Sequence, residues 1–596
     1  MLKHYFLIIY RNMLKSKSTF IINLVGLSIG LACVLLIYLW VNDEIHIDKF
    51  HKNDDQLFQV MEVSKANDKI NVGTGTQGLL AETMSEELPE VEAATTFFSF
   101  VNEGYSFNLK NSKDEIIKAG GVFADEKFFD MFSYTLIEGQ ASQVLKDKNS
   151  VVISKSLAGI LFGLNVDPVG KSFEWEIVGK KGTAKVSGVF EDVPANSTQK
   201  FDFVGTKAAL FELIPNFTKW YNEGSNTFLL LKKGTNVVAF NKKIKDFVKK
   251  YSDRFTLFVR PYSSAYLYGN YENGVQAGGR IEYVRLFSII GFLILVIACI
   301  NFINLSTATA ATREKEIGVK KAVGSARRDL ILQFLIESVF TVLVALIFAI
   351  GLVWLLTPQF NQITGKSVSL HLSPLVILYL AGGAVLTGIL SGYYPAFYLS
   401  GISTISVLKG KRKTSFSELM ARKGLVVFQF VISLFLIVSV LVIYRQVQFI
   451  QTMNLGYDRD NVIYVEKEGP LMENSESFLN RVRELPGIAK ASAINGSIAQ
   501  GADHATTTGM EWPGKQPDRP IVFSIKTVDY DLLETLGISM AEGRSFSRNF
   551  GAEENNLIFN ETAIKAMGLE KPIGKTVNLW GKEMTIIGIA KDFFAN

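Results

Sequence analysis

Residues 19–41 read TFIINLVGLSIGLACVLLIYLWV, a run of 23 residues without a charge. At about 1.5 Å per residue, a helix of this length crosses the roughly 30 Å hydrocarbon core of a bilayer. The residues that follow, Trp40-Val41-Asn42, lack the small-x-small pattern of a cleavage site, so we interpret the run as a permanent anchor. The same arithmetic predicts four further spans, over residues 284–312, 331–357, 374–399 and 424–444.

The composition agrees with a membrane protein that also has large polar domains. The chain has 596 residues, 48% of them hydrophobic, and a mean hydropathy of +0.21. These values exclude a purely soluble enzyme, a disordered chain and a fibrous protein. A net charge of +5 is too small for a nucleic-acid binder of this length. Two cysteines, both inside apolar runs, exclude a disulfide framework and a cysteine-based zinc site.

Basic residues near the span ends predict the orientation of the chain. Residues 1–18 hold four basic and no acidic side chains, residues 313–329 hold six against three, and residues 400–423 hold six against one. Because loops rich in Lys and Arg stay in the cytoplasm, we expect the N-terminus to be cytoplasmic. The cytoplasmic segments are then residues 1–18, 313–330 and 400–423, and the outer segments are residues 42–283, 358–373 and 445–596.

Residues 1–18 are further expected to form a short helix in the membrane interface. Leu2, Phe6, Ile9 and Met13 recur there at helical spacing. The alternative is a frayed cytoplasmic tail.

The two large outer segments share an internal repeat. ADEKFFDMF around Asp125 corresponds to VDYDLLETL around Asp529, an offset of 404 residues. The same offset relates Gly139 to Gly543, Pro168 to Pro572 and Gly170 to Gly574. We therefore expect two copies of one mixed α+β domain, with strands at 151–153, 186–189 and 228–231 and an amphipathic helix at 237–251. The second copy stops soon after the last shared block, which predicts that the sequence ends inside a domain.

Both copies contain a lookalike of a phosphate-binding loop, Gly170-Lys171-Ser172 and Gly574-Lys575-Thr576. A Walker A loop needs a glycine five residues before the second glycine, where this chain has Asn165 and Leu569. We interpret both sequences as turns that lead into strands.

No catalytic or metal-binding pattern is evident in the sequence. The five histidines include no HExxH. His46 and His51 follow the first span, and we expect them in an exposed polar collar at the membrane surface, although a metal site is the alternative. No Ser/His/Asp grouping can be proposed from spacing, so we predict that the chain is not itself an enzyme.

Two GxxxG pairs lie within predicted spans: Gly26 with Gly30, and Gly388 with Gly392. Such pairs allow close helix packing, although they are frequent in apolar helices.

The segment REKEIGVKKAVGSARRDL, residues 313–330, joins the second and third spans. Ile317, Val319, Ala322 and Val323 lie among its charges, and Gly318 and Gly324 are expected breaks. A charged helix in this place can press on a cytoplasmic partner. On physical grounds alone, a solvated loop is an equally good interpretation.

Four stretches together resemble the FtsX-like, MacB-type ABC transporter permeases, in a long duplicated variant. They are RNMLKSKSTFIINLVGLSIGLA from Arg11, REKEIGVKKAVGSARRDLILQFLIES from Arg313, YPAFYLSGISTISVLKGK from Tyr394, and LGYDRDNVIYVE from Leu455. The outer segments resemble MacB periplasmic core domains. Long members of the family have eight spans in two half-units, so the resemblance leaves three spans unaccounted for after Asn596.

This resemblance implies a multi-pass membrane subunit of the bacterial inner membrane that works with a separate cytoplasmic ATPase. ATP and Mg would bind to that ATPase, and this chain would bind no cofactor. The implied work is export of a periplasmic or membrane-embedded substrate, with a periplasmic adaptor or outer-membrane protein as a further partner. The alternatives are a mechanotransmission regulator of cell-wall hydrolases, a ligand sensor and a static scaffold. Coupling to the ATPase would fall on Arg313, Lys315, Glu316, Ile317, Gly318, Lys320, Ala322 and Gly324.

Overall fold

A computed structural model describes residues 17–66, 69–111, 113–308, 310–401, 416–496, 505–516, 520–551 and 553–594. The chain divides into a helical unit, residues 1–46 and 280–452, and an outer unit, residues 47–279 and 453–596. The interfacial helix expected over residues 1–18 lies almost entirely outside the described residues, as does most of the linker over 400–423.

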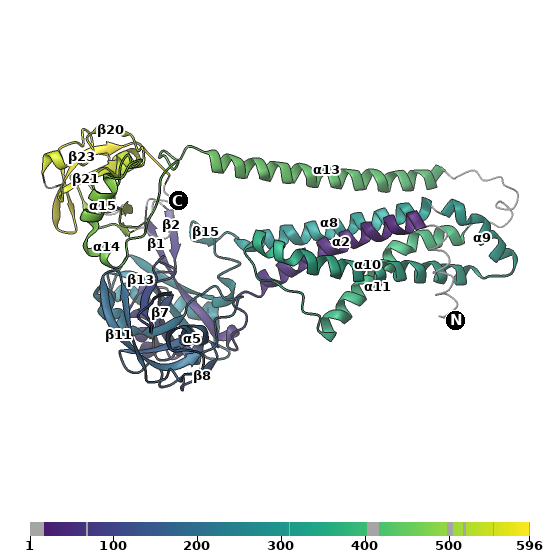
Figure 1. Cartoon of the computed structure of the whole chain (residues 1–596), viewed down its shortest axis with the longest axis horizontal. Coiled ribbons are helices and arrows are strands. Elements are labelled where there is room, and N and C mark those ends of the chain that lie inside the picture. Colours follow the sequence, from purple (N-terminus) through teal and green to yellow (C-terminus); the bar gives the residue numbers. More distant parts are fainter. Residues whose placement is uncertain are drawn as a thin grey trace. The chain divides into compact units, whose positions relative to one another are not determined.

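Five helices of the described chain are long and apolar enough to cross a membrane (Figure 1). They are α2 (Lys17–Ile45), α8 (Arg280–Ala308), α10 (Arg327–Thr364), α11 (Pro374–Ser400) and α13 (Phe416–Thr452). Helices α2, α10 and α13 extend past both ends of their predicted spans, and α10 continues through Pro358 to Thr364. Helix α8 begins before its predicted span, at Arg280, but ends at Ala308, short of the predicted residue 312. The predicted fold class, a helical membrane protein with large mixed α+β domains, is confirmed.

Small residues allow close packing inside the helical unit. A Cβ added at Gly30 of α2 would lie 2.8 Å from the Cβ of Ala298 in α8, and one at Gly26 would lie 3.0 Å from Nδ2 of Asn301. In α11, a Cβ at Gly388 would lie 2.6 Å from Cα of Val339 in α10. All these distances are shorter than ordinary carbon contacts, so the two GxxxG pairs lie where α2 meets α8 and where α11 meets α10.

The first outer domain is built on one 14-stranded sheet. Three of its strands pair beside the main path: β2 (Lys69–Gly73), β3 (Thr76–Gln77) and β8 (Leu136–Glu138). The other strands follow the order β14 (Phe255–Pro261), β1 (Leu57–Ala66), β13 (Glu223–Leu231), β4 (Val91–Ser99), β7 (Gly121–Ala124), β12 (Phe203–Thr206), β9 (Ser150–Ser154), β11 (Lys180–Phe190), β10 (Ser172–Ile177), β5 (Phe107–Lys110) and β6 (Ile116–Ala119).

Helices cover this sheet, among them α3 (Leu80–Glu87), α5 (Lys155–Phe162), α6 (Lys207–Leu213) and α7 (Val237–Ile244). The strands predicted at 151–153, 186–189 and 228–231 lie in β9, β11 and β13. The amphipathic helix predicted over 237–251 is shorter than expected, because α7 ends at Ile244 and a separate 3-10 turn covers Phe247–Lys250.

The second outer domain repeats part of this sheet. Its strands include β20 (Met540–Gly543), β21 (Asn556–Asn560), β22 (Thr576–Leu579) and β23 (Lys582–Ala590), and helix α17 (Glu561–Met567) follows β21. Strand β21 lies parallel to β23, as β9 lies parallel to β11. Strands β22 and β20 lie antiparallel to β23, as β10 and β8 do to β11.

A side-chain contact is also shared by the two copies. The backbone N–H of Ser156 donates to Oδ1 of Asp192 at 3.0 Å, and that of Thr562 donates to Oδ1 of Asp592 at the same distance. Both hydroxyls donate to the second carboxylate oxygen, at 2.5 and 2.7 Å. The first contact joins the start of α5 to the loop after β11, and the second joins the start of α17 to the loop after β23.

One expectation from the sequence is wrong. His51 is not in an exposed collar: its side chain is 3% exposed and packs among Phe50, Phe132, Tyr134 and Tyr262. Its Nδ1 accepts a hydrogen bond from the backbone N–H of Ser133 at 3.1 Å. Burial lowers the pKa of His51 to about 4, so the ring is neutral at physiological pH.

Candidate coupling site

The segment between α8 and α10 forms helix α9 (Ala310–Ala322), which lies near the end of α11 in the helical unit (Figure 1). Charges four residues apart support it, since Nζ of Lys320 lies 2.9 Å from Oε1 of Glu316. The helix ends at Ala322, and Gly324 lies in the turn that follows, where its φ of +101° suits glycine. The backbone N–H groups of Gly324 and Ser325 donate to the carbonyls of Lys321 and Lys320, which closes the helix end.

One face of α9 is anchored to two spanning helices by a small apolar cluster. Ile317 is 3% exposed. It packs in a cluster with Leu330 and Phe334 of α10 and with Ala396 and Leu399 of α11. Gly318 beside it is also buried. A displacement of α9 must therefore either move the ends of α10 and α11 or break this cluster, since cores of this density deform little.

Polar contacts strengthen the same anchor. Nζ of Lys321 donates to the backbone carbonyl of Ser400 at 2.7 Å, and Nε of Arg327 donates to Oγ of Ser400 at 3.4 Å. Nζ of Lys320 donates to Oε1 of Gln333 in α10 at 3.3 Å. Because Ser400 is the last residue of α11, these cations lie at the negative end of its helix dipole.

The opposite face of α9 is open to solvent. Val319 is 55% exposed and Val323 is 83% exposed. Ala322 and Gly324 are exposed beside them. We call Val319, Ala322 and Val323 the apolar tip of α9. This end of the helix therefore exposes a small group of aliphatic side chains, while the Ile317 face is buried.

The structure brings together only some of the residues predicted for coupling. Glu316, Ile317, Gly318 and Lys320 lie on or beside the anchored face, whereas Ala322 and Gly324 lie at the exposed end. Arg313 and Lys315 belong to the helical backbone of α9, and their side chains are outside the described part of the structure.

Sequence reasoning missed Lys321, Gln333 and Ser400. Lys321 and Ser400 are 79 positions apart, and no periodic pattern links them.

Within the described residues, no three His, Cys, Asp or Glu side chains lie close enough together to hold a metal ion.

Two protein families match this chain. Residues 20–247 and 424–596 match the family described as MacB-like periplasmic core domain. Residues 288–404 match the family described as FtsX-like permease C-terminal, and this range includes α9. The first family accounts for more than half of the chain.

Individual relatives match over shorter stretches. The chain is 30% identical over 123 residues to "Macrolide export ATP-binding/permease protein MacB 2" of Aeromonas hydrophila, which is 21% of this chain and 19% of that protein. It is 31% identical over 124 residues to "Macrolide export ATP-binding/permease protein MacB" of Bdellovibrio bacteriovorus, again 21% and 19%. The match thus spans about a fifth of the length of these relatives.

Two solved structures are also similar to parts of the chain. One is the periplasmic region of MacB from Actinobacillus actinomycetemcomitans, with 17% identity and a TM-score of 0.26 over 35% of this chain and 89% of that one. The other is the extracellular domain of the ABC-type transporter YknZ from Gram-positive bacteria, with 12% identity and a TM-score of 0.25 over 34% and 99%.

Proposed function

The chain belongs to the MacB-like periplasmic core domain family, and we propose that it is the membrane (permease) subunit of a MacB/FtsX-type ABC transporter. In this proposal a separate cytoplasmic ATPase binds ATP and Mg, and its closure pushes on α9. The outer domains respond by changing shape, and that change exports or extrudes a periplasmic or membrane-embedded substrate. The chain itself performs no hydrolysis. It lies in the bacterial inner membrane with α9 and its N-terminus in the cytoplasm.

The main observation in support of the proposal is that one face of α9 is buried against spanning helices while the opposite face is exposed. Its Ile317 face is fixed to the ends of α10 and α11, while its apolar tip is exposed. A partner that binds the tip therefore moves spanning helices and not a loose loop.

The route onward is a chain of packed elements. Helix α10 packs against α2 through Val342, Ala345 and Leu346, and α2 packs against Ala298 and Phe302 of α8. The backbone continues from Ile45, the last residue of α2, into β1 of the first outer domain at Leu57. It leaves that domain at Gly279, immediately before α8 begins at Arg280.

The proposal is tested by placing a charge on the apolar tip. We expect Val319→Asp and Val323→Asp to reduce co-purification of the ATPase by about tenfold or more, because an unpaired carboxylate would be buried at the contact. Val238→Asp is the matched control, since Val238 is a valine of the first outer domain that is 69% exposed. A candidate ABC ATPase from the same organism would be co-expressed and captured through a tag on this chain. Equal capture by all three variants would refute the docking of the ATPase on α9.

A further inference from the structure

Helices α2 and α8 pack against each other along most of their length (Figure 1). Near the outer end, the rings of Trp40 and Phe287 lie 4.9 Å apart. Near the other end, Gly26 meets the side-chain amide of Asn301. Between these two contacts α2 advances by the same number of residues by which α8 goes back. The two helices are therefore antiparallel and keep one register.

This register brings two further asparagines to the interface. Asn23 is three residues before Gly26 in α2, and Asn304 is three residues after Asn301 in α8. Residues three apart in a helix lie on neighbouring turns of one face. Asn23 is therefore opposite the turn of α8 that carries Asn301 and Asn304. We call these three asparagines the amide cluster.

Two oxygen atoms of the amide cluster are buried and have no hydrogen-bond partner among the described residues. They are Oδ1 of Asn23 and Oδ1 of Asn304. Asn23 as a whole is 8% exposed. By contrast, the hydroxyl of Ser28 in α2 donates to the backbone carbonyl of Leu24 at 2.6 Å. The amide oxygens have no such bond within their own helices.

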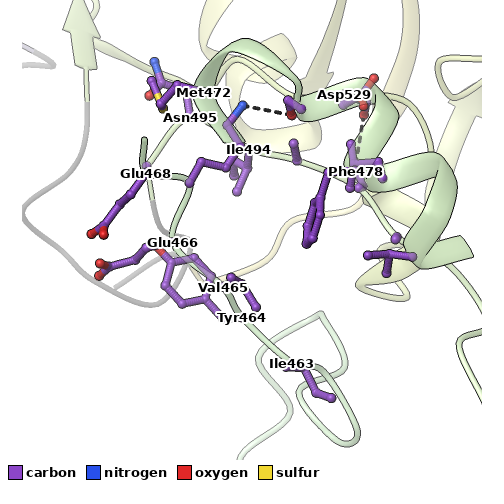
Figure 2. Close-up of a pocket in the computed structure, with 18 of the residues that line it drawn as sticks. Ile463, Tyr464, Val465, Glu466, Glu468, Met472, Phe478, Ile494, Asn495 and Asp529 are labelled. Carbon is purple, nitrogen blue, oxygen red and sulfur yellow. Dashed lines mark hydrogen bonds between the residues drawn. The ribbon is translucent and has the colours of Figure 1, made fainter. Parts of the chain in front are cut away.

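An asparagine of the outer unit reaches water directly. Asn495 and Glu466 are both exposed at an open hollow of that unit (Figure 2). Asn23 and Asn304 lack this access, because they lie in helices that are long and apolar enough to cross a membrane. Lipid tails offer no hydrogen bond, so an unpaired amide oxygen is costly there. A donor must therefore come from a molecule bound at the amide cluster.

The chemistry of the cluster favours water as that molecule. Water donates two hydrogen bonds, one for each of the two oxygens, and it can accept further bonds from an amide N–H. A cation in this place would need a negative charge nearby. Helix α2 has no acidic residue before Asp43, and α8 has none after Glu282. Neither helix therefore supplies a counter-charge at the level of the cluster.

We propose that Asn23, Asn301 and Asn304 form a binding site for a water molecule between α2 and α8, within the membrane. The water donates one hydrogen bond to Oδ1 of Asn23 and one to Oδ1 of Asn304, and it accepts one from the amide of Asn301. Gly26 leaves room for this amide, since a Cβ there would lie 3.0 Å from Nδ2 of Asn301. The site is independent of any ATPase bound to α9.

Paired substitutions in the full chain in detergent test the site. Asn23→Leu and Asn304→Leu each leave one oxygen without a water held by two partners. We expect each to lower the midpoint of thermal unfolding by about 3 °C or more. The double variant removes both oxygens and with them the need for a donor, so its midpoint should return close to that of the wild type.

Ser28→Ala combined with Asn304→Leu is the matched control. Ser28 is bonded to its own helix, so the two losses should add. All unfolding measurements are repeated with choline chloride in place of sodium chloride at the same ionic strength. The recovery in the Asn23→Leu/Asn304→Leu variant should be the same in both salts, because water needs no sodium.

Hydroxyl-radical labelling by radiolysis detects the water itself and needs only the wild-type chain in lipid nanodiscs. Radicals form from water at the site, so residues 301–305 should be labelled although lipid and α2 separate them from bulk solvent. Residues 342–349 of α10 contain only apolar side chains and should stay unlabelled. Labelling at residues 301–305 should disappear in the double variant.

Four results would contradict the water site. Losses that add in the double variant, or wild-type residues 301–305 that stay unlabelled, would show that no water joins the asparagines. Recovery in the double variant without labelling would indicate a direct bond between the two amides. Recovery that requires sodium would indicate a bound cation in place of the water.

Discussion

At the scale of single residues, Glu62 is an unusual carboxyl group. It lies in the middle of β1 and is 4% exposed. Its Oε1 accepts a hydrogen bond from Nε2 of Gln77 at 2.7 Å. Burial, and after it the nearby charge of Glu223, raise the pKa of Glu62 to about 8. The folded state therefore keeps a proton on Glu62 that the unfolded chain releases near pH 4.5.

Glu62→Gln should change how stability depends on pH. Because the pKa is raised on folding, the proton on Glu62 stabilises the fold fully below pH 4.5, and this contribution is lost as the pH rises through about 8. The loss is at most about 1.4 kcal/mol per pH unit in that window. Glutamine keeps the acceptor for Gln77 without a charge, so the variant should be the more stable protein at pH 8.

The measurement is the exchange of β1 amides in the full chain at pH 4.5 and pH 8, with wild type and variant compared at each pH. We expect slower exchange in the variant at pH 8 and little difference at pH 4.5. A difference that is the same at both pH values would show that Glu62 does not titrate as described.

At the scale of elements, the packing of α11 on α10 depends on Gly388 and Gly392 of α11. A Cβ at Gly392 would lie 2.6 Å from Cβ and Oγ of Ser338. Ser391 beside it is fully buried and donates to the carbonyl of Thr387. The same two helices hold Ile317 of α9, so their separation sets the anchor of the coupling site.

Gly392→Val should separate α10 from α11 and loosen α9. We expect a loss of about 1–3 kcal/mol in stability, as for other overpacked contacts. Gly382→Val is the control, because a Cβ at Gly382 in the same helix meets nothing within 4 Å. Thermal unfolding of the full chain in detergent and proteolysis within residues 313–330 are the readouts. If the two variants unfold at the same temperature and are cleaved equally, Gly392 is not needed for the packing of α11 on α10.

How far the sequence predicts these elements depends on what determines them. The spans are local runs of apolar residues, so length and hydropathy were sufficient. Helix α9 was expected only as one of two equal interpretations, because its anchor depends on contacts with Ala396, Leu399 and Ser400, which are distant in sequence. His51 was misplaced because its polar neighbours in sequence are not its neighbours in space. Val319 and Val323 were noted among the charges, but only the structure shows that they are exposed.

At the scale of the whole molecule, the proposed transmission passes through the joint between α2 and the first outer domain. Asp48 lies three residues after the end of α2. Its Oδ1 accepts from the backbone N–H of Thr198 at 2.8 Å, and its Oδ2 accepts from the Thr198 hydroxyl at 2.6 Å. The backbone N–H of Asp48 donates to the carbonyl of Asn196 at 2.8 Å. In the second domain a backbone bond of the opposite direction lies after α13, where the N–H of Phe594 donates to the carbonyl of Leu455 at 2.8 Å.

Asp48→Ala should uncouple the outer domain from the helices. We expect the ATPase to co-purify normally, because Asp48 is far in sequence from α9 and belongs to the outer unit. The ATP-dependent change in protease sensitivity of residues 191–202 should be lost, because the two side-chain bonds that hold this loop are removed. Asp55→Ala, at an exposed position seven residues later, is the control. A normal ATP response in the Asp48 variant would exclude a role for this joint.

In the proposed function, α9 faces an ATPase on one side of the membrane while the outer domains work on the other. A direct measurement is the labelling of single cysteines with a membrane-impermeant maleimide, after Cys33 and Cys299 are replaced by serine. Leu164→Cys, at a side chain that is 94% exposed, should react in intact spheroplasts. Val323→Cys should react only in inverted vesicles, and bound ATPase should block it. Reaction of both positions from the same side would contradict this orientation, and reaction of Val323→Cys unaffected by bound ATPase would contradict the docking of the ATPase on α9.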